Sequence, residues 1–165
     1  HAGWQIAQAE YVARELGTHR FIAAENHYNL LDRRAELEVM PAARQFGLGV
    51  LPYFPLANGL LTGKYAEGKA PAGSRLSHSK PGLLESTNWT QLKEFSDFCA
   101  DRGFTEVQVA FSWLAQQNPV ASVIAGATTI EQVRANAQAA SLQLSEADMA
   151  RLDEIFPAPE KIALF

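Results

Sequence analysis

The sequence predicts an α/β protein built on a parallel sheet. Three short apolar runs alternate with stretches of helical periodicity along the 165 residues. Strands that alternate with helices indicate parallel pairing through right-handed crossovers. Three strands are too few to stand alone, because a parallel sheet is normally covered on both faces and its edges invite further pairing. Either partner strands come from elsewhere, or the chain is half of a closed barrel.

Helical periodicity begins with the first residues of the chain. One face of this predicted helix carries Trp4, Ala7, Tyr11 and Leu16. Gly17 supplies the stop. Because no strand, turn or cap precedes the helix, we expect that an N-terminal part is missing. A buried strand follows at residues 21–25 and ends in the polar stretch Glu25-Asn26-His27.

The middle of the chain predicts one helix, one strand and a long irregular segment. Helical spacing returns over residues 34–46, although Pro41 is tolerated only in a first turn, so the helix proper should start near it. The second strand is expected over 49–53. Residues 56–88 are rich in Gly, Pro, Ser, Lys and Asn. A structureless segment of more than about 15 residues is uncommon unless it has a function.

Helices dominate the last part of the sequence. One is predicted to begin near Trp89 and to end before Gly103, and Thr105 opens the next with a capping box. The third strand is predicted at residues 121–125. Two further helices follow it, and Ser145 caps the second of them.

Composition and charge exclude several classes of protein. A formal net charge of −4 with no basic stretch argues against a nucleic-acid partner. Cys99 is a single cysteine, which excludes an internal disulfide framework and fits a reducing, cytoplasmic compartment. No apolar run approaches the roughly 20 residues that span a bilayer. The histidines show no metal-ligand spacing, and no G-x-S-x-G motif supports a hydrolase, so neither a metal site nor a hydrolase is predicted.

Three stretches follow the predicted strands and are candidates for a binding site, because ligands of parallel α/β folds lie at the carboxyl ends of strands. They are Glu25-Asn26-His27, Tyr53-Phe54-Pro55-Leu56 and Gly126-Ala127-Thr128. The last leads into a helix N-terminus, where backbone N–H groups and the helix dipole favour an anion. Gln132 and Asn136, four residues apart, could read the edge of a base. The alternative is that Thr129 and Gln132 form a capping box on a solvated face.

Three further residues also allow two interpretations. Lys64 and Arg75 could hold phosphates, or they could be solvated surface charges. Tyr53 could stack on a planar ring, or it could be a packed core aromatic. The residues alone leave these alternatives open.

Four runs together resemble the C-terminal half of an aldo-keto reductase. They are ENHYNLLDR, GLGVLPYFPLANGLLTGKY, VQVAFSWL and IAGATTIEQVRAN. Their order and spacing match from Ala2 to about Glu154, and the similarity is greatest to the bacterial branch that also resembles potassium-channel beta subunits. The resemblance implies a partial (β/α)8 TIM barrel. Residues 1–165 would be its single C-terminal half, holding about the last three strands with their helices, and the N-terminal half would be absent.

The same resemblance implies the cofactor contacts, residue by residue. Tyr53 matches the aromatic residue that stacks on the nicotinamide, and Glu25 stands where the family usually has a carboxamide-binding glutamine. A carboxylate accepts from the carboxamide NH₂ but cannot donate to its oxygen. The loop along the pyrophosphate is matched by Phe54, Pro55, Leu56, Ala57 and Asn58, with Lys64 and Arg75 as its basic residues. The site for the adenosine 2′-phosphate and the adenine is matched by Gly126, Thr128, Gln132 and Asn136.

The activity implied by the resemblance is the NADP(H)-dependent reduction of aldehydes and ketones to alcohols, with a small carbonyl compound as substrate. The family's catalytic Asp, Tyr, Lys and His lie in its N-terminal half, and none of their motifs is present here. No catalytic residue is therefore assigned, and the chain on its own is expected to be inactive. We expect it to self-associate or to pair with the missing N-terminal half. The alternative is a non-catalytic half-barrel that binds nucleotides or serves in assembly.

Overall fold

The computed structural model of the chain describes residues 1–67, 71, 76, 81–139 and 141–160. The chain forms two compact units. The first unit consists of His1–Pro55, Leu114–Ala125 and Ala158–Phe165, and the second of Leu56–Trp113 and Gly126–Pro157. Helices and parallel strands are both present, so the predicted α/β class is confirmed.

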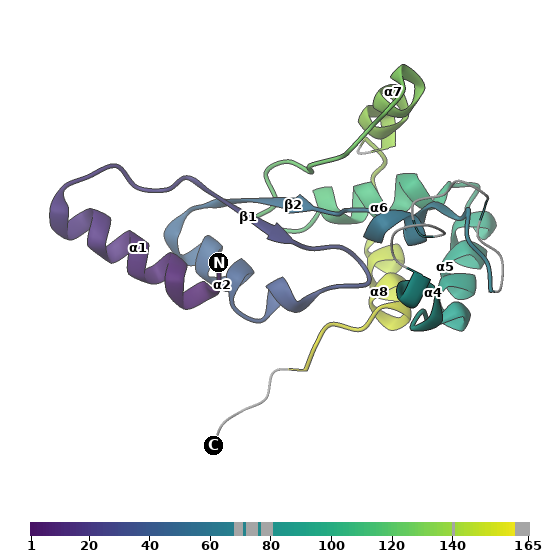
Figure 1. Cartoon of the computed structure of the whole chain (residues 1–165), viewed down its shortest axis with the longest axis horizontal. Helices are drawn as coiled ribbons and strands as arrows, with labels where there is room; N and C mark the ends of the chain where they lie inside the picture. Colours follow the sequence, from purple (N-terminus) through teal and green to yellow (C-terminus); the bar gives the residue numbers. More distant parts are fainter. Residues whose placement is uncertain (68–70, 72–75, 77–80, 140, 161–165) are drawn as a thin grey trace. The chain divides into compact units, whose positions relative to one another are not determined.

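A two-stranded parallel sheet forms the centre of the first unit. Strand β1 (Ala23–His27) pairs with β2 (Gly49–Tyr53), and the register places Ala23 opposite Gly49 and His27 opposite Tyr53 (Figure 1). The second predicted strand is thus confirmed with its bounds. The first was predicted two residues too early, since Phe21 and Ile22 are exposed and Glu25-Asn26-His27 belongs to the strand. Backbone pairing with β2 sets these bounds, not the position of the apolar run.

The third predicted strand, residues 121–125, is wrong as a regular strand. The chain does run parallel to β2 here. The N–H of Val50 donates to the carbonyl of Pro119 (2.9 Å), and the carbonyl of Val50 accepts from the N–H of Ala121 (2.9 Å). The parallel contact is limited to an isolated bridge at Val50, so the described residues form two strands where three were predicted.

Proline at position 52 explains why this third ladder stops. A regular parallel ladder would continue from Val50 to Pro52, which faces the same edge two residues further on. Proline has no N–H, so it cannot donate to the neighbouring segment. Its carbonyl instead accepts from the N–H of Ile124 (2.9 Å), one residue later than regular spacing requires. The shift takes the segment out of register with β2.

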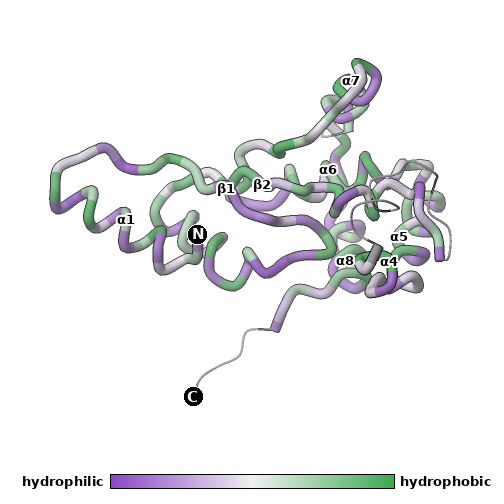
Figure 2. Tube along the Cα trace, viewed as in Figure 1, coloured by the Kyte–Doolittle hydropathy of each residue, from purple (hydrophilic) through white to green (hydrophobic). Residues whose placement is uncertain are grey.

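Helices α1 (Gly3–Leu16) and α2 (Val39–Phe46) pack together in the first unit. The helical face that carries Trp4, Tyr11 and Leu16 is exposed, so it is not the face that packs in the first unit. The buried residues of this helix are instead Gly3, Ile6, Glu10 and Ala13. The tube along α1 alternates between hydrophilic and hydrophobic residues, so hydropathy leaves more than one face possible (Figure 2).

Close backbone approach selects the buried face of α1. A Cβ atom at Gly3 would lie 2.7 Å from the carbonyl oxygen of Glu38, at the start of α2. Only glycine allows this distance. The predicted helix over 34–46 is divided into a 3₁₀ turn, η1 (Arg34–Glu36), and α2, in which Pro41 is the third residue. Pro41 therefore lies in a first turn, as predicted.

The remaining elements follow in chain order. They are η2 (Ala57–Thr62), α4 (Pro81–Glu85), α5 (Trp89–Asp101), α6 (Glu106–Ala115), α7 (Ile130–Ala139) and α8 (Glu146–Ile155). The predicted long irregular segment thus includes η2 and α4. The predicted caps are confirmed at Thr105, which exchanges hydrogen bonds with Gln108, and at Ser145, which does so with Asp148. No helix in the described part of the chain is long and apolar enough to cross a membrane.

Helices α5 and α8 form part of the core of the second unit. Phe95 meets Phe156 edge to face, with ring centroids 5.4 Å apart, and both side chains are buried. The side chain of Gln91 donates to the carbonyl of Ile155 (2.7 Å). At the other end of the pair, Arg102 binds Asp148. A polar contact therefore lies on each side of the aromatic pair.

A buried carboxylate on α1, that of Glu10, is paired with two arginines in the first unit. The carboxylate of Glu10 is 3% exposed and accepts from Arg14 Nε (2.6 Å) and Arg20 Nε (2.8 Å). The hydrogen bond from Arg20 is the largest influence and, with Arg14, holds the pKa of Glu10 below its ordinary value of 4.5. A lowered pKa in the folded state means that this group contributes stability above pH 4.5, and that the contribution is lost as the pH falls through the folded pKa.

Replacing Glu10 with glutamine should therefore reduce the acid sensitivity of the chain. We expect Glu10→Gln to melt at a lower temperature than the unmutated chain at pH 7, and to lose less of its melting temperature between pH 7 and pH 3. Circular dichroism melts at several pH values measure this. Glu15→Gln removes an exposed carboxylate from the same helix and should leave the acid sensitivity unchanged. An equal loss in Glu10→Gln and in the unmutated chain would contradict the assignment.

Candidate functional site

The carboxyl ends of β1 and β2 bring Glu25, His27 and Tyr53 onto one face of the sheet. The register pairs Glu25 with Leu51 and His27 with Tyr53, and alternate residues of a strand share a face. The rings of His27 and Tyr53 are stacked, with centroids 5.5 Å apart and 13° between their planes. The ring of Phe54 stands edge-on to both. The sheet thus ends in an aromatic cluster with an exposed carboxylate, Glu25, two residues before His27.

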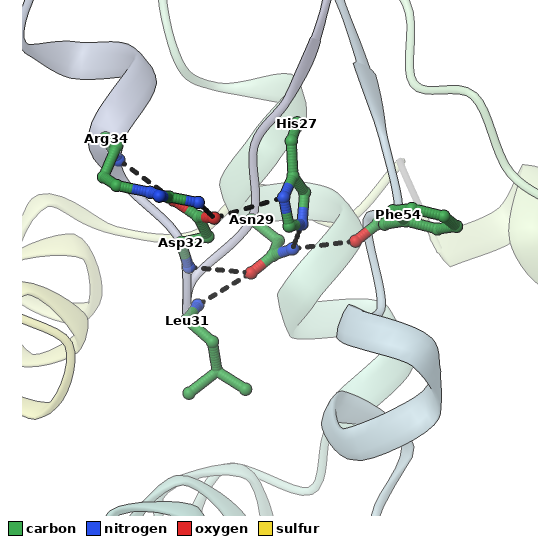
Figure 3. A network of polar contacts seen from close by, with 6 residues as sticks. All are labelled: His27, Asn29, Leu31, Asp32, Arg34 and Phe54. Carbon is green, nitrogen blue, oxygen red and sulfur yellow. Dashed lines mark hydrogen bonds and ion pairs between the residues drawn. The ribbon is translucent and has the colours of Figure 1, made fainter. Parts of the chain in front are cut away.

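Charged groups hold the His27 ring from the turn that follows β1. His27 Nδ1 lies 3.1 Å from Asp32 Oδ2. The guanidinium of Arg34 binds both oxygens of the same carboxylate, at 2.8 and 2.6 Å (Figure 3). The hydrogen bond from Arg34 is the main reason that the pKa of Asp32 lies below its ordinary value, and Asp32 in turn raises the pKa of Arg34. Asp32 is therefore a carboxylate at neutral pH and an acceptor for the His27 ring.

Left-handed backbone follows β2. Phe54 has φ 54°, and Ala57, Asn58 and Gly59 have φ 47°, 59° and 101°. Residues other than glycine rarely adopt this conformation, and strained backbone of this kind concentrates at functional sites. The N–H of Gly59 donates to the carbonyl of Leu56 (2.7 Å), which closes the turn. The predicted pyrophosphate loop is therefore a backbone whose conformation the surrounding structure must hold in place.

The other residues predicted for this loop differ in exposure. Pro55 and Ala57 are buried, and Leu56 and Asn58 are half-buried. The buried side-chain oxygen of Asn58 has no hydrogen-bond partner among the described residues. Lys64 is exposed, with its Nζ 5.1 Å from the centre of the Tyr65 ring and 3.2 Å from where a Cβ of Gly59 would lie. Arg75 lies outside the described residues.

The start of α7 combines capping with exposed donors. Thr129 Oγ1 accepts from the N–H of Gln132 (3.2 Å), and Gln132 Oε1 accepts from the N–H of Thr128 (2.7 Å). The cap predicted as the alternative is therefore present, with Thr129 accepting from Gln132 and the Gln132 side chain accepting from Thr128. Gln132 retains its Nε2 hydrogens, which are donors only. Gly126, Thr128 and Gln132 are exposed, and Asn136 is half-buried.

Sequence reasoning missed the part that Asn29, Asp32 and Arg34 play at this end of the sheet. Asn29 is completely buried and contacts both His27 and the carbonyl of Phe54. Its position two residues after β1 was a usable signal, because asparagine favours turns by hydrogen bonding to nearby backbone N–H groups. Its partner Phe54, the residue after β2, could not be found this way, since it is 25 residues distant in the chain.

Two other kinds of chemistry find no support among the described residues. No group of three or more His, Cys, Asp or Glu residues in that part of the chain is arranged to hold a metal ion. Cys99 is buried on α5, and burial is the main cause that raises the pKa of its thiol to about 12. A thiol with that pKa carries almost no thiolate at neutral pH, which is the reactive form.

Comparison with known proteins identifies the family. The chain matches the Aldo/keto reductase family over residues 2–156. It is 37% identical over 158 residues to the "Uncharacterized oxidoreductase YrpG" of Bacillus subtilis, covering 96% of this chain and 47% of that protein. It is 34% identical over 137 residues to the "NADH-specific methylglyoxal reductase" of Escherichia coli, covering 81% and 41%. It is also 34% identical over 142 residues to a "Probable voltage-gated potassium channel subunit beta" of Oryza sativa, covering 82% and 43%.

The chain therefore belongs to the aldo/keto reductase family, and the predicted resemblance is confirmed. It spans about half the length of the curated relatives it matches. The α/β elements are consistent with membership of this family.

Proposed function

We propose that the protein is an NADP(H)-dependent oxidoreductase that reduces aldehydes or ketones to alcohols, and that this chain supplies cofactor contacts. The observation that carries the proposal is the carboxyl end of the sheet, where Glu25 and Tyr53 share a face. Two relatives have oxidoreductase or reductase in their names, which supports the class of reaction. One of them is named as NADH-specific, so the choice between NADPH and NADH needs its own measurement.

The chemistry of the first unit fits the nicotinamide end of the cofactor. The half-buried ring of Tyr53 offers a planar surface on which a nicotinamide can stack. The carboxylate of Glu25 can accept a hydrogen bond from the carboxamide NH₂. When bound, the reduced cofactor supplies a hydride to the carbonyl carbon of the substrate. The part of Tyr53 and Glu25 is to orient the ring that carries this hydride.

The chemistry of α7 fits the adenosine end. A helix N-terminus favours an anion. Gly126 and Thr128, which precede α7, are exposed to solvent. Gln132 Oε1 is bound to Thr128, so its Nε2 donors suit a phosphate oxygen. Asn136 lies one turn further along the same face. Lys64 adds an exposed positive charge suited to the pyrophosphate.

Removing the two amides of α7 should weaken cofactor binding. In the whole protein, we expect the double variant Gln132→Ala and Asn136→Ala to raise the Kd for NADPH roughly 10-fold or more, since one or two hydrogen bonds at about 1 kcal/mol each are lost. Titration of NADPH fluorescence measures this. The same titration with NADH decides the cofactor preference.

The capping contact of Gln132 gives the contrasting expectation. If these amides serve only the helix, the double variant melts at a lower temperature but binds NADPH with unchanged affinity. Arg134→Ala removes an exposed side chain from the same helix and serves as the matched control. Absence of NADPH and NADH binding by the unmutated protein would contradict the oxidoreductase proposal and favour the non-catalytic assembly module.

A further inference from the structure

Asn29 is a buried side chain that makes four polar contacts at the end of the sheet. It is 0% exposed. Its Oδ1 accepts from the backbone N–H groups of Leu31 and Asp32, both at 2.9 Å. Its Nδ2 donates to the carbonyl of Phe54 (2.8 Å) and lies 3.1 Å from His27 Nε2 (Figure 3). Two N–H groups on one side and a carbonyl on the other fix which end of the amide is oxygen.

The hydrogen bond from Asn29 to the Phe54 carbonyl stabilises a strained backbone conformation. Phe54 has φ 54°, which is disfavoured for a residue with a side chain. Phe54 directly follows Tyr53 in the chain, so an anchor on the Phe54 carbonyl also restrains the main chain that carries the Tyr53 ring. Asn29 supplies that anchor from the turn after the neighbouring strand.

Asn29 also acts on Tyr53 through the His27 ring, which stacks on the Tyr53 ring. Because Asn29 Nδ2 carries only hydrogens, His27 Nε2 must be the acceptor, and the ring proton must lie on Nδ1. That proton points to Asp32, 3.1 Å from Nδ1, and Arg34 holds the carboxylate in place. The imidazole is therefore fixed in tautomer and orientation, and it stacks on Tyr53.

We propose that Asn29 is a positioning residue that sets Tyr53 for the nicotinamide, through the Phe54 carbonyl and through the His27 ring. The proposal rests on the proposed cofactor function. In this proposal Asn29 does not itself contact the cofactor. Its effect is therefore confined to the nicotinamide end and spares the binding of the adenosine end.

The test compares two ligands in the whole protein. Asn29→Ala should weaken NADPH binding roughly 10-fold or more, on the scale of the lost hydrogen bonds, while the Kd for 2′,5′-ADP changes less than about twofold. Asn29→Asp keeps the acceptor for the turn but loses both donors, so it should show the same split if Asn29→Ala does not fold. The matched control is Ser112→Ala, which loses a buried hydrogen bond to the Ala139 carbonyl (2.6 Å) and should change neither affinity.

A second measurement does not depend on the cofactor. Nitrogen-detected NMR of the His27 ring should show protonation at Nδ1 in the unmutated protein, and Asn29→Ala should shift the Nε2 signal because Nε2 loses its hydrogen-bond donor. Protonation at Nε2 in the unmutated protein would overturn the proposal, as would equal weakening of both ligands or unchanged NADPH affinity in Asn29→Ala. A His27 ring protonated at Nδ1 in a protein that binds neither NADPH nor NADH would show that the geometry holds and that the cofactor function fails.

Discussion

Phe95→Ala is expected to destabilise the chain by about 3–5 kcal/mol, the usual cost of truncating a buried phenylalanine. The side chain is 1% exposed and meets Phe156 edge to face between α5 and α8. Its removal leaves a cavity between two helices that are also joined by the bond from Gln91 to the Ile155 carbonyl. For a chain of this size the melting temperature should fall by roughly 6–20 °C, at about 2–4 °C per kcal/mol.

Phe95→Leu is the matched control for this prediction. It keeps most of the buried volume, so it should cost less than half as much as the alanine variant. Chemical denaturation of both variants measures the difference in the free energy of unfolding. A loss below about 1 kcal/mol for Phe95→Ala would show that α5 and α8 do not pack as described.

Gly63→Ala is expected to be the second largest change, at about 2–3 kcal/mol. The backbone of Gly63 has φ 73°, and an added Cβ would lie 2.5 Å from a carboxylate oxygen of Glu106. Left-handed backbone costs a residue with a side chain roughly 1–2 kcal/mol. Glu106 can move away only by giving up the hydrogen bond from Ser96 Oγ (2.8 Å), at about 1 kcal/mol more.

Gly103→Ala separates the two contributions. Gly103 has φ 69° and belongs to the same unit, but nothing lies within 4 Å of an added Cβ. It should therefore show only the backbone cost. Thermal melts of the two variants compare them directly, and equal losses would mean that the carboxylate of Glu106 is not held against Gly63. In a Glu106→Ala background, where the bond from Ser96 is already absent, Gly63→Ala should cost no more than Gly103→Ala.

The helices could be predicted well because their signals are local. Ser145 and Thr105 cap helices that begin one residue later, and Gly17 adopts the left-handed conformation that ends α1. These contacts lie within a few residues, so the sequence carries them directly. The inner face of α1 could not be predicted, because Gly3 becomes buried only through its approach to Glu38.

Some residues of the candidate site could likewise be predicted from the sequence, and others could not. The candidate residues Glu25 and Tyr53 could be named from the run of motifs, and their place on a common face follows from the parallel register. The part of Asn29 could not be inferred, because its partner Phe54 follows the other strand, far along the chain. A hydrogen bond between residues 25 apart leaves no periodic signal.

The sequence by itself determined the α/β class, the family, most helix bounds and the second strand, since periodicity, caps and motifs are written in neighbouring residues. Only the tertiary structure decided the register of β1, the failure of the third ladder at Pro52 and the aromatic cluster around Tyr53. Each of these depends on which backbone groups of distant segments meet. Proline at position 52 does not disturb a strand on its own. It stops a ladder only where the neighbouring segment would accept a hydrogen bond from the N–H that proline lacks.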